Sequence, residues 1–224
     1  MKKDLTRRQF LQRSALTAGA LATTTSILLP DNRLNAASYP GANDRIRFGI
    51  IGVGMQGSGL LPNAIQLPGV ECIAAADLYD GRHTLAREIT NKPNLPVTRH
   101  YQELLDNRDI DCIIAAVPDF WHRKVLVDAV AAGKDIYCEK PMSHDAADGV
   151  AMVKAGKDSG RIIQIGSQRV SSVICAKARE LLAQGIIGDL MLVEGSMGRN
   201  DPNGAWEYPP PFDLSPQNLD WNGW

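Results

Sequence analysis

One short segment, 52–57 (Gly-Val-Gly-Met-Gln-Gly), constrains the fold of this 224-residue chain more than any other. It directly follows the apolar run 46–51 and leads into residues of helical composition, so it predicts a tight turn from a strand into a helix. Gly52 permits the turn, and Gly54 lets the phosphates of a ligand approach the backbone closely. Gly57 lets the helix pack on the strand, while the helix N-terminus supplies N–H groups for an anion. The segment therefore predicts the first unit of a nucleotide-binding α/β fold.

A carboxylate at the end of the next apolar run refines this prediction. Asp77 lies twenty residues after Gly57, the spacing at which dinucleotide-binding proteins place an acid against the adenosine ribose. Its carboxylate can accept both ribose hydroxyls and would repel a 2′-phosphate, and the following Leu78 and Tyr79 supply no cation. The pattern predicts a site for NAD, with NADP the less favoured cofactor. The alternative is a glycine-rich turn in an unrelated nucleotide or metabolite fold.

Short apolar runs alternate with segments of helical composition from Asn43 onward. The runs cover residues 46–51, 70–76, 110–117, 135–138 and 161–165, and the helical segments cover about 57–66, 79–90, 120–132 and 145–159. The piece 91–107 contains two prolines and is typical of a loop with a short helical turn and a minor strand near Val97. This alternation predicts a doubly wound, mostly parallel sheet, because right-handed crossovers place helices on both faces.

Two further strand ends carry chemically useful side chains. Residues 117–122 and 137–141 each close an apolar run, and in an open parallel sheet ligands bind outside the carboxyl ends of the strands. Lys140 is a cation that can hydrogen-bond a substrate hydroxyl or assist its deprotonation, and Glu139 can orient a cofactor or hold the lysine. Taken alone, a Glu-Lys pair of this kind is more often a solvated surface pair. His122, likewise, is alone more often a helix-cap or packing histidine than an acid or base.

The first 37 residues have the layout of a secretory signal. A basic beginning (Lys2, Lys3, Arg7, Arg8, Arg13) is followed by the apolar stretch 15–29 and by small residues at 36–38. The apolar stretch is too short for a comfortable permanent membrane anchor, and Thr6–Leu11 resembles the twin-arginine export signature. We expect a periplasmic or exported protein without stable membrane insertion after cleavage. The alternative is a retained amphipathic or membrane-anchoring helix.

Composition excludes several classes of protein. The chain is 22% charged and 44% hydrophobic, which is ordinary for a globular protein and argues against a disordered tail, a collagen-like fibre or a disulfide-rich miniprotein. Its formal net charge of -1 weighs against a nucleic-acid partner, and residues 1–37 hold more basic than acidic residues, so the remainder is more acidic still. The partner we expect is therefore a small molecule, with no nucleic acid bound.

The cysteines indicate neither a zinc site nor a disulfide framework. Cys72, Cys112, Cys138 and Cys175 lie far apart, without a C-x-x-C pair or a histidine at metal spacing. Buried free thiols are the favoured interpretation, and no metal is expected. One disulfide remains open, because an exported protein can form one.

Taken together, these segments resemble the Gfo/Idh/MocA family of NAD(P)-dependent oxidoreductases. The resemblance rests on residues 46–57, Asp77, 117–122, Glu139-Lys140-Pro141 and 165–169 (Ile-Gly-Ser-Gln-Arg), in the order of the family and at about its spacing. It extends over essentially all of 43–224, and Glu-Lys-Pro is its most diagnostic element. Within the family, the chain most resembles the exported bacterial branch with twin-arginine signals, which includes glucose-fructose oxidoreductase-like proteins and NAD-dependent glycosidases.

The resemblance implies roles for individual residues. It implies that Lys140 lies beside the nicotinamide and the reacting sugar carbon, with an unusual peptide geometry at Pro141. It also implies that Gln168 and His122 surround the nicotinamide end. The expected site residues are Lys140 as the catalytic group, and Gly52, Gly54, Met55, Gln56, Gly57, Asp77, Pro118, His122, Glu139 and Gln168 as cofactor ligands.

The chain departs from the family after the dinucleotide-binding part. Family members continue into an α/β domain with an open antiparallel sheet, which binds substrate and supports oligomers. This chain offers a helix at 171–184, a strand at 189–196 and a Pro- and Gly-rich stretch at 200–216, and no histidine follows His144. The expected downstream catalytic histidine is thus absent, and a homo-oligomer is expected only if the whole second domain is present. Residues 206–224 are typical of a substrate-side loop, or of a segment that packs against a missing domain.

The resulting expectation is a signal at 1–37, a linker at 38–43, a Rossmann-like domain at 44–166 and an incomplete substrate domain at 167–224. The resemblance implies hydride transfer between NAD and a carbinol carbon of a sugar or cyclic polyol. One alternative is a glycosidase that oxidises its sugar transiently through bound NAD. The other is a cofactor-loaded sugar-binding protein without turnover.

Overall fold

The computed structural model describes residues 45–198, 202 and 208–224. The expected export signal at 1–37 and the linker at 38–43 lie outside the described residues. Within the described part, no helix combines the length and the apolar character needed to cross a membrane.

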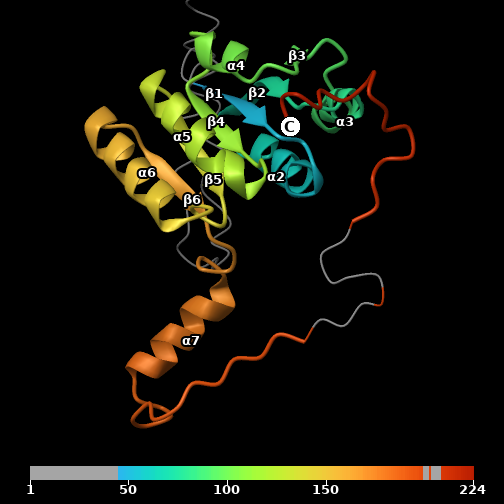
Figure 1. Cartoon of the computed structure of the whole chain (residues 1–224). Helices are drawn as coiled ribbons and strands as arrows, with labels where there is room; N and C mark the ends of the chain where they lie inside the picture. Colours follow the sequence, from blue (N-terminus) through green and yellow to red (C-terminus); the bar gives the residue numbers. More distant parts are fainter. Residues whose placement is uncertain (1–44, 199–201, 203–207) are drawn as a thin grey trace, which may run out of the picture. The chain divides into compact units, whose positions relative to one another are not determined.

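The described part contains a six-stranded sheet in the order β3-β2-β1-β4-β5-β6 (Figure 1). Every neighbouring pair runs parallel. The strands are β1 (Ile46–Ile51), β2 (Val70–Ala76), β3 (Val97–Thr98), β4 (Cys112–Ala115), β5 (Asp135–Glu139) and β6 (Ile163–Gly166). This is the doubly wound Rossmann-like sheet that the alternating sequence predicts, with β1 at its centre.

Six helices and one 3-10 turn connect the strands or follow them in the described residues. They are α2 (Met55–Ile65), α3 (Asp80–Thr90), α4 (Gln102–Asp106), η1 (Asp119–Trp121), α5 (His122–Ala131), α6 (Ala146–Ser159) and α7 (Val173–Ala183). The side chains of a strand alternate between its two faces, so each strand feeds two separate cores. Ile50 and Ala75 pack with residues of α2 and α3, whereas Ile51 and Ala76 pack with residues of α4, α5 and α6. Helices therefore cover both faces, as predicted (Figure 1).

The segment after β6 differs from the prediction. Ser172 begins α7 by accepting a hydrogen bond from the Cys175 N–H at 3.1 Å, so the expected helix is present. The strand predicted at 189–196 is wrong, because these residues form no sheet pairing within the described part of the chain. Leu192 and Val193 are 80% and 75% exposed. An apolar alternating segment becomes a strand only where a neighbouring strand takes up its backbone hydrogen bonds.

The four cysteines are free, and three of them are shielded from solvent. Burial raises the pKa of the Cys72 and Cys138 thiols to about 12 and that of Cys112 to about 11. Cys175 lies exposed on α7, so the expectation of a buried thiol is wrong at this position. Its helix buries no residue in the described structure, and the sequence pattern alone did not show this.

These differences predict selective alkylation, because the thiolate is the reactive form of cysteine. At pH 8, iodoacetamide should modify Cys175 in the folded chain, and the other three cysteines should react only after denaturation. Mass spectrometry of the modified peptides measures the result. Rapid labelling of Cys72 or Cys138 in the folded protein would contradict the described burial.

Candidate functional site

The glycine turn between β1 and α2 has the geometry that its sequence predicts. Gly52 has a φ of 87°, and a Cβ there would lie 2.4 Å from the carbonyl oxygen of Ala116. A Cβ at Gly57 would lie only 2.0 Å from the carbonyl oxygen of Gly52. Around Gly54, by contrast, a Cβ would meet no atom within 4 Å. The first and third glycines are thus required by the protein itself, whereas the middle one borders open space.

The open space at Gly54 adjoins the N-terminus of α2. Gly54 is the N-cap residue of this helix, no side chain caps it, and its first turn holds no acidic residue. The N–H groups of an uncapped first turn seek an acceptor, and the helix dipole favours an anion there. Met55, at the first position of the helix, is 64% exposed. This end of α2 can therefore receive a phosphate group.

Asp77 lies beside the same turn. Its Oδ2 accepts a hydrogen bond from the Val53 N–H at 2.8 Å, and its Oδ1 accepts one from the Tyr79 N–H at 3.0 Å. The carboxylate is thus fixed between the glycine turn and the connection from β2 to α3. Each oxygen has a second lone pair for a ligand hydroxyl, which is the arrangement that an adenosine ribose requires.

Glu139 joins the other end of the site to the start of α2. It is 3% exposed, and its Oε1 accepts a hydrogen bond from Gln56 Nε2 at 3.1 Å. The Tyr137 hydroxyl also reaches this oxygen, at 3.4 Å. Burial, with the charge of Glu139 as the next cause, raises the pKa of Tyr137. Glu139 therefore ties the end of β5 to the helix that follows the glycine turn.

Lys140 presents a side chain to solvent at the same edge. The Glu139 carboxylate accepts the Lys140 backbone N–H at 3.2 Å, and within the described residues the ammonium group makes no hydrogen bond or ion pair. Glu139 therefore holds the lysine through its backbone, and the surface ion pair considered from the sequence does not form. The peptide bond from Lys140 to Pro141 is cis, the unusual geometry that the resemblance implies.

His122 connects two loops of the site. The ring is 1% exposed, with Nδ1 at 2.6 Å from the Pro141 carbonyl oxygen and Nε2 at 3.0 Å from that of Val117. Both ring nitrogens are thus engaged with backbone. These contacts leave neither ring nitrogen for a hydrogen bond to a cofactor. The ring holds the Lys140–Pro141 turn against the end of β4, and its predicted place around the nicotinamide end remains a prediction.

Two predicted residues follow the strands on either side of β5. Pro118 is the N-cap residue of η1, three residues after the end of β4, and its carbonyl accepts the Trp121 N–H at 2.9 Å. Gln168 is exposed in the turn after β6. No described hydrogen bond links Gln168 to the other predicted residues. The structure therefore connects the glycine turn, Asp77, Glu139 and Lys140 through contacts, and it places Pro118 and Gln168 at the same edge without such a link.

Tyr137 adjoins Glu139 in the structure but was not predicted as a site residue. Tyr137 and Glu139 are two residues apart on β5, so their side chains share one face of the sheet, and this spacing was the available signal. The adjacent Gly166 gives them room, because a Cβ there would lie 2.5 Å from the Tyr137 hydroxyl oxygen and 2.9 Å from Glu139 Oε1.

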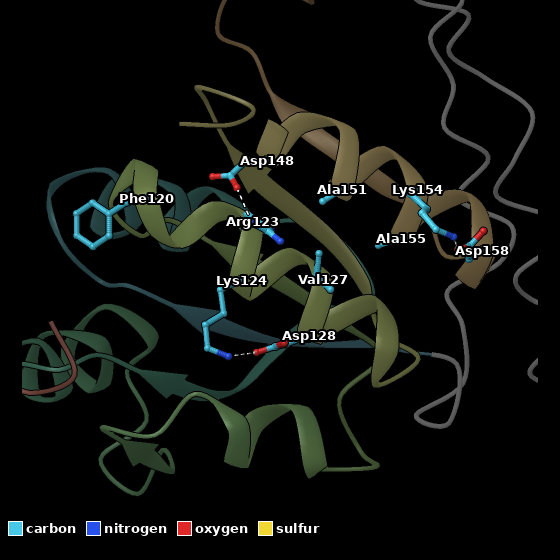
Figure 2. Close-up of a pocket in the computed structure, with 10 residues that line it drawn as sticks. All are labelled: Phe120, Arg123, Lys124, Val127, Asp128, Asp148, Ala151, Lys154, Ala155 and Asp158. Atoms are coloured by element: carbon cyan, nitrogen blue, oxygen red, sulfur yellow. Dashed lines mark hydrogen bonds and ion pairs between the residues drawn. The ribbon is translucent and has the colours of Figure 1, made fainter. Parts of the chain in front are cut away.

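A shallow groove between α5 and α6 is separate from this edge (Figure 2). None of the predicted site residues lines it. Its charged side chains pair with one another: Arg123 with Asp148 at 2.9 Å, Lys124 with Asp128 at 2.8 Å and Lys154 with Asp158 at 2.5 Å. The groove therefore offers paired surface charges rather than a group for catalysis.

The chain is similar in sequence to a known dehydrogenase and to a protein named a glycosyl hydrolase. It is 30% identical to inositol 2-dehydrogenase of Salmonella typhimurium (strain LT2) over 154 residues, which are 67% of this chain and 45% of that protein. It is 25% identical over 203 residues to a glycosyl hydrolase family 109 protein of Parabacteroides distasonis, with 83% of this chain and 43% of that protein covered. The chain thus spans less than half the length of these relatives.

Solved structures show the same fold. The crystal structure of myo-inositol 2-dehydrogenase from Lactobacillus plantarum matches with a TM-score of 0.61 and 26% identity, covering 66% of this chain and 43% of that one. Scyllo-inositol dehydrogenase from Lactobacillus casei, solved with NAD(H) and scyllo-inositol, matches in fold with a TM-score of 0.60 and 24% identity over 65% of this chain and 43% of that one. The model of the oxidoreductase family with an NAD-binding Rossmann fold matches residues 46–167. The chain therefore belongs to the Gfo/Idh/MocA family of oxidoreductases.

Proposed function

We propose that this chain binds NAD and serves hydride transfer between the nicotinamide and a carbinol carbon of a sugar or cyclic polyol. The observation that carries the proposal is the open space at Gly54, which adjoins the uncapped N-terminus of α2. Asp77 stands beside it, held by the glycine turn. The relatives named inositol dehydrogenases support a polyol as the substrate class.

The described residues fit a dinucleotide. Gly52, Gly54, Met55, Gln56 and Gly57 would surround its pyrophosphate, and Asp77 would bind the adenosine ribose. Pro118, Glu139 and Gln168 would line the nicotinamide half, with His122 acting through the loops that it joins.

The carboxylate of Asp77 favours NAD over NADP. A carboxylate repels a 2′-phosphate, and phosphorylated ribose needs a cation nearby. Arg99, which follows β3, is engaged by Asp80 in a two-point ion pair at 2.8 and 2.6 Å. Its guanidinium group is therefore already occupied.

Lys140 would manage the hydroxyl proton of the substrate. When bound, the nicotinamide supplies the acceptor for the hydride that leaves the carbinol carbon. As the neutral amine, Lys140 would take the hydroxyl proton, and as the ammonium it would return this proton in the reverse reaction. His122 and Glu139 hold the turn that carries Lys140 through its backbone, which leaves the amine free to approach the substrate.

The proposal predicts the behaviour of two matched glycine variants. Gly54→Ala should still fold, because its Cβ meets no protein atom within 4 Å, with a loss of about 1 kcal/mol or less because alanine is a poorer N-cap residue than glycine. It should weaken NAD binding about tenfold or more, a loss of about 1.4 kcal/mol, because the methyl group occupies the space intended for the pyrophosphate. Calorimetric titration with NAD and thermal unfolding measure the two effects. The control is Gly59→Ala, whose Cβ also meets open space. Equal NAD affinity in the two variants would contradict the proposed phosphate site at Gly54.

A second candidate function is net hydrolysis of a glycoside. The similarity to a glycosyl hydrolase family 109 protein over 83% of this chain favours it, and it would use the same cofactor residues. Incubation with polyols, sugars and aryl glycosides separates the candidates. Accumulation of NADH supports the dehydrogenase, whereas glycoside cleavage without net change of cofactor supports the glycosidase. A sugar-binding protein without turnover would show neither.

Export by the twin-arginine route is part of the proposal, motivated by the segment Thr6–Leu11. We expect the double substitution Arg7→Lys with Arg8→Lys to retain the protein in the cytoplasm, because this route reads the arginine pair. Cell fractionation and immunoblotting measure the distribution, with Arg13→Lys as the matched control. Unchanged periplasmic protein in the double variant would exclude the route.

A further inference from the structure

Residues 213–220, here called the C-terminal strap, lie along the connection between β2 and α3 (Figure 1). The Asp220 N–H donates to the Leu78 carbonyl at 3.0 Å, and the Asp80 N–H donates to the Asn218 carbonyl at 2.9 Å. These two hydrogen bonds enclose an isolated antiparallel bridge between the two segments. The strap therefore holds the connection by its backbone, in the manner of a short added strand.

Side chains reinforce this contact. Leu219 is 6% exposed, so the strap is anchored by an apolar residue. The Arg99 guanidinium, paired with Asp80, also donates to the Gln217 carbonyl at 2.9 Å. One cation thus links β3, the start of α3 and the strap.

The strap acts on the peptide groups that flank Tyr79. The strap donates a hydrogen bond to the Leu78 carbonyl on one side and accepts one from the Asp80 N–H on the other. In addition, the Tyr79 hydroxyl donates to the Asp213 carboxylate. The backbone N–H of Tyr79 is the group that donates to Asp77 Oδ1 at 3.0 Å. The orientation of that N–H, and with it the position of one carboxylate oxygen, therefore depends on the strap.

The geometry points to the strap as a positioning element for Asp77 in the recognition of the adenosine ribose of NAD. This inference rests on the proposed dinucleotide site and adds residues about 140 positions away in the sequence to it. Asp77 Oδ2 is fixed by its hydrogen bond from the glycine turn, so the strap affects the position of the other oxygen, Oδ1. Loss of the strap contact releases that oxygen and weakens selection for the ribose 2′-hydroxyl, without touching the pyrophosphate position.

Two substitutions at one position separate the backbone contact from the side chain. Both Asp220→Pro and Asp220→Ala remove the carboxylate, but only proline removes the N–H that donates to Leu78. The residue before a proline prefers extended backbone, and Leu219 has it, since it forms the bridge with Tyr79. Tyr79→Phe, which removes the hydroxyl bound to Asp213, provides a second test without a backbone change.

The readout is the ratio of the dissociation constants for NAD and for NAD whose adenosine ribose lacks the 2′-hydroxyl. We expect the unsubstituted protein and Asp220→Ala to prefer NAD about tenfold, the size of one hydrogen bond to a charged group. In Asp220→Pro this preference should fall to about twofold or less, and in Tyr79→Phe it should also decrease. A purely structural role would weaken both ligands equally and leave the ratio unchanged.

The outcomes distinguish the strap from the site on which it depends. If the unsubstituted protein binds neither ligand, the proposed dinucleotide site is wrong. If it prefers NAD and the ratio stays near tenfold in both Asp220→Pro and Tyr79→Phe, the strap does not position Asp77. Thermal unfolding is measured in parallel, and if Asp220→Pro does not fold, the ratio in Tyr79→Phe decides.

Discussion

Replacing Gly57 with alanine is expected to lower the free energy of unfolding by about 3 kcal/mol or more. Overpacking in a well-packed interior typically costs 1–3 kcal/mol, and here the added Cβ would lie 2.0 Å from the carbonyl oxygen and 2.9 Å from the carbonyl carbon of Gly52. These atoms are backbone of a turn whose φ of 87° is already fixed, so they cannot yield as a flexible side chain would. Urea unfolding followed by circular dichroism measures the loss.

Gly59→Ala is the matched control for this prediction. Both glycines lie on α2, but a Cβ at Gly59 would meet nothing within 4 Å. Alanine in a helix interior is favoured over glycine by about 0.5–1 kcal/mol, so Gly59→Ala should be slightly more stable than the unsubstituted chain. Similar urea midpoints for Gly57→Ala and Gly59→Ala would show that the close approach between α2 and the turn is not required.

Lys140→Met is expected to lower kcat for polyol oxidation by a factor of about 10² to 10⁴, the usual contribution of a positioned acid or base. Methionine keeps much of the apolar length of lysine but has no group that can take or return a proton. NAD affinity should change by about twofold or less, because the contacts of the site with this turn involve the backbone N–H of Lys140 and not its ammonium. Steady-state kinetics and NAD titration, with the protein expressed from its complete reading frame, provide the two numbers.

The matched control for Lys140→Met is Lys154→Met on α6. Lys154 pairs with Asp158 on the exposed side of its helix at 2.5 Å, and it lies outside the predicted site. The Lys154→Met variant loses the same charge as Lys140→Met and should retain full activity. A fall in kcat of equal size in both variants, or no fall in Lys140→Met, would assign the proton transfer to another group.

Local patterns were sufficient to predict the elements that depend on neighbours in the sequence. The glycine turn, Asp77 at the end of β2 and the alternation of strands and helices each follow from periodicity or from the steric needs of one residue type. The parallel sheet then follows from the alternation itself. This accounts for the agreement between 46–51 or 70–76 and the strands of the structure.

Features that depend on distant residues could not be predicted in this way. The apolar pattern of 189–196 favours a strand, but it does not tell whether a partner strand is present. For His122, the sequence suggested both a packing role and a cofactor contact, and no local pattern showed that its ring reaches the carbonyls of Val117 and Pro141. The pairing of Tyr79 with Leu219 joins residues far apart in the chain, and no local signal marks it.

The position of β1 in the sheet has a consequence for the order in which the site can form during folding. The Gly52 N–H donates to the Ala76 carbonyl, and the Ala116 N–H donates to the Ile51 carbonyl, both at 2.8 Å. The turn is therefore hydrogen-bonded to the ends of both β2 and β4. The Ala116 carbonyl oxygen lies 2.4 Å from the position that a Cβ at Gly52 would occupy. A nascent chain that ends before β4 already contains the glycines of the turn and Asp77. It still lacks the Ala116 carbonyl, which lies against Gly52. We therefore expect the nucleotide site to be complete only after β4, about sixty residues downstream, has docked beside β1.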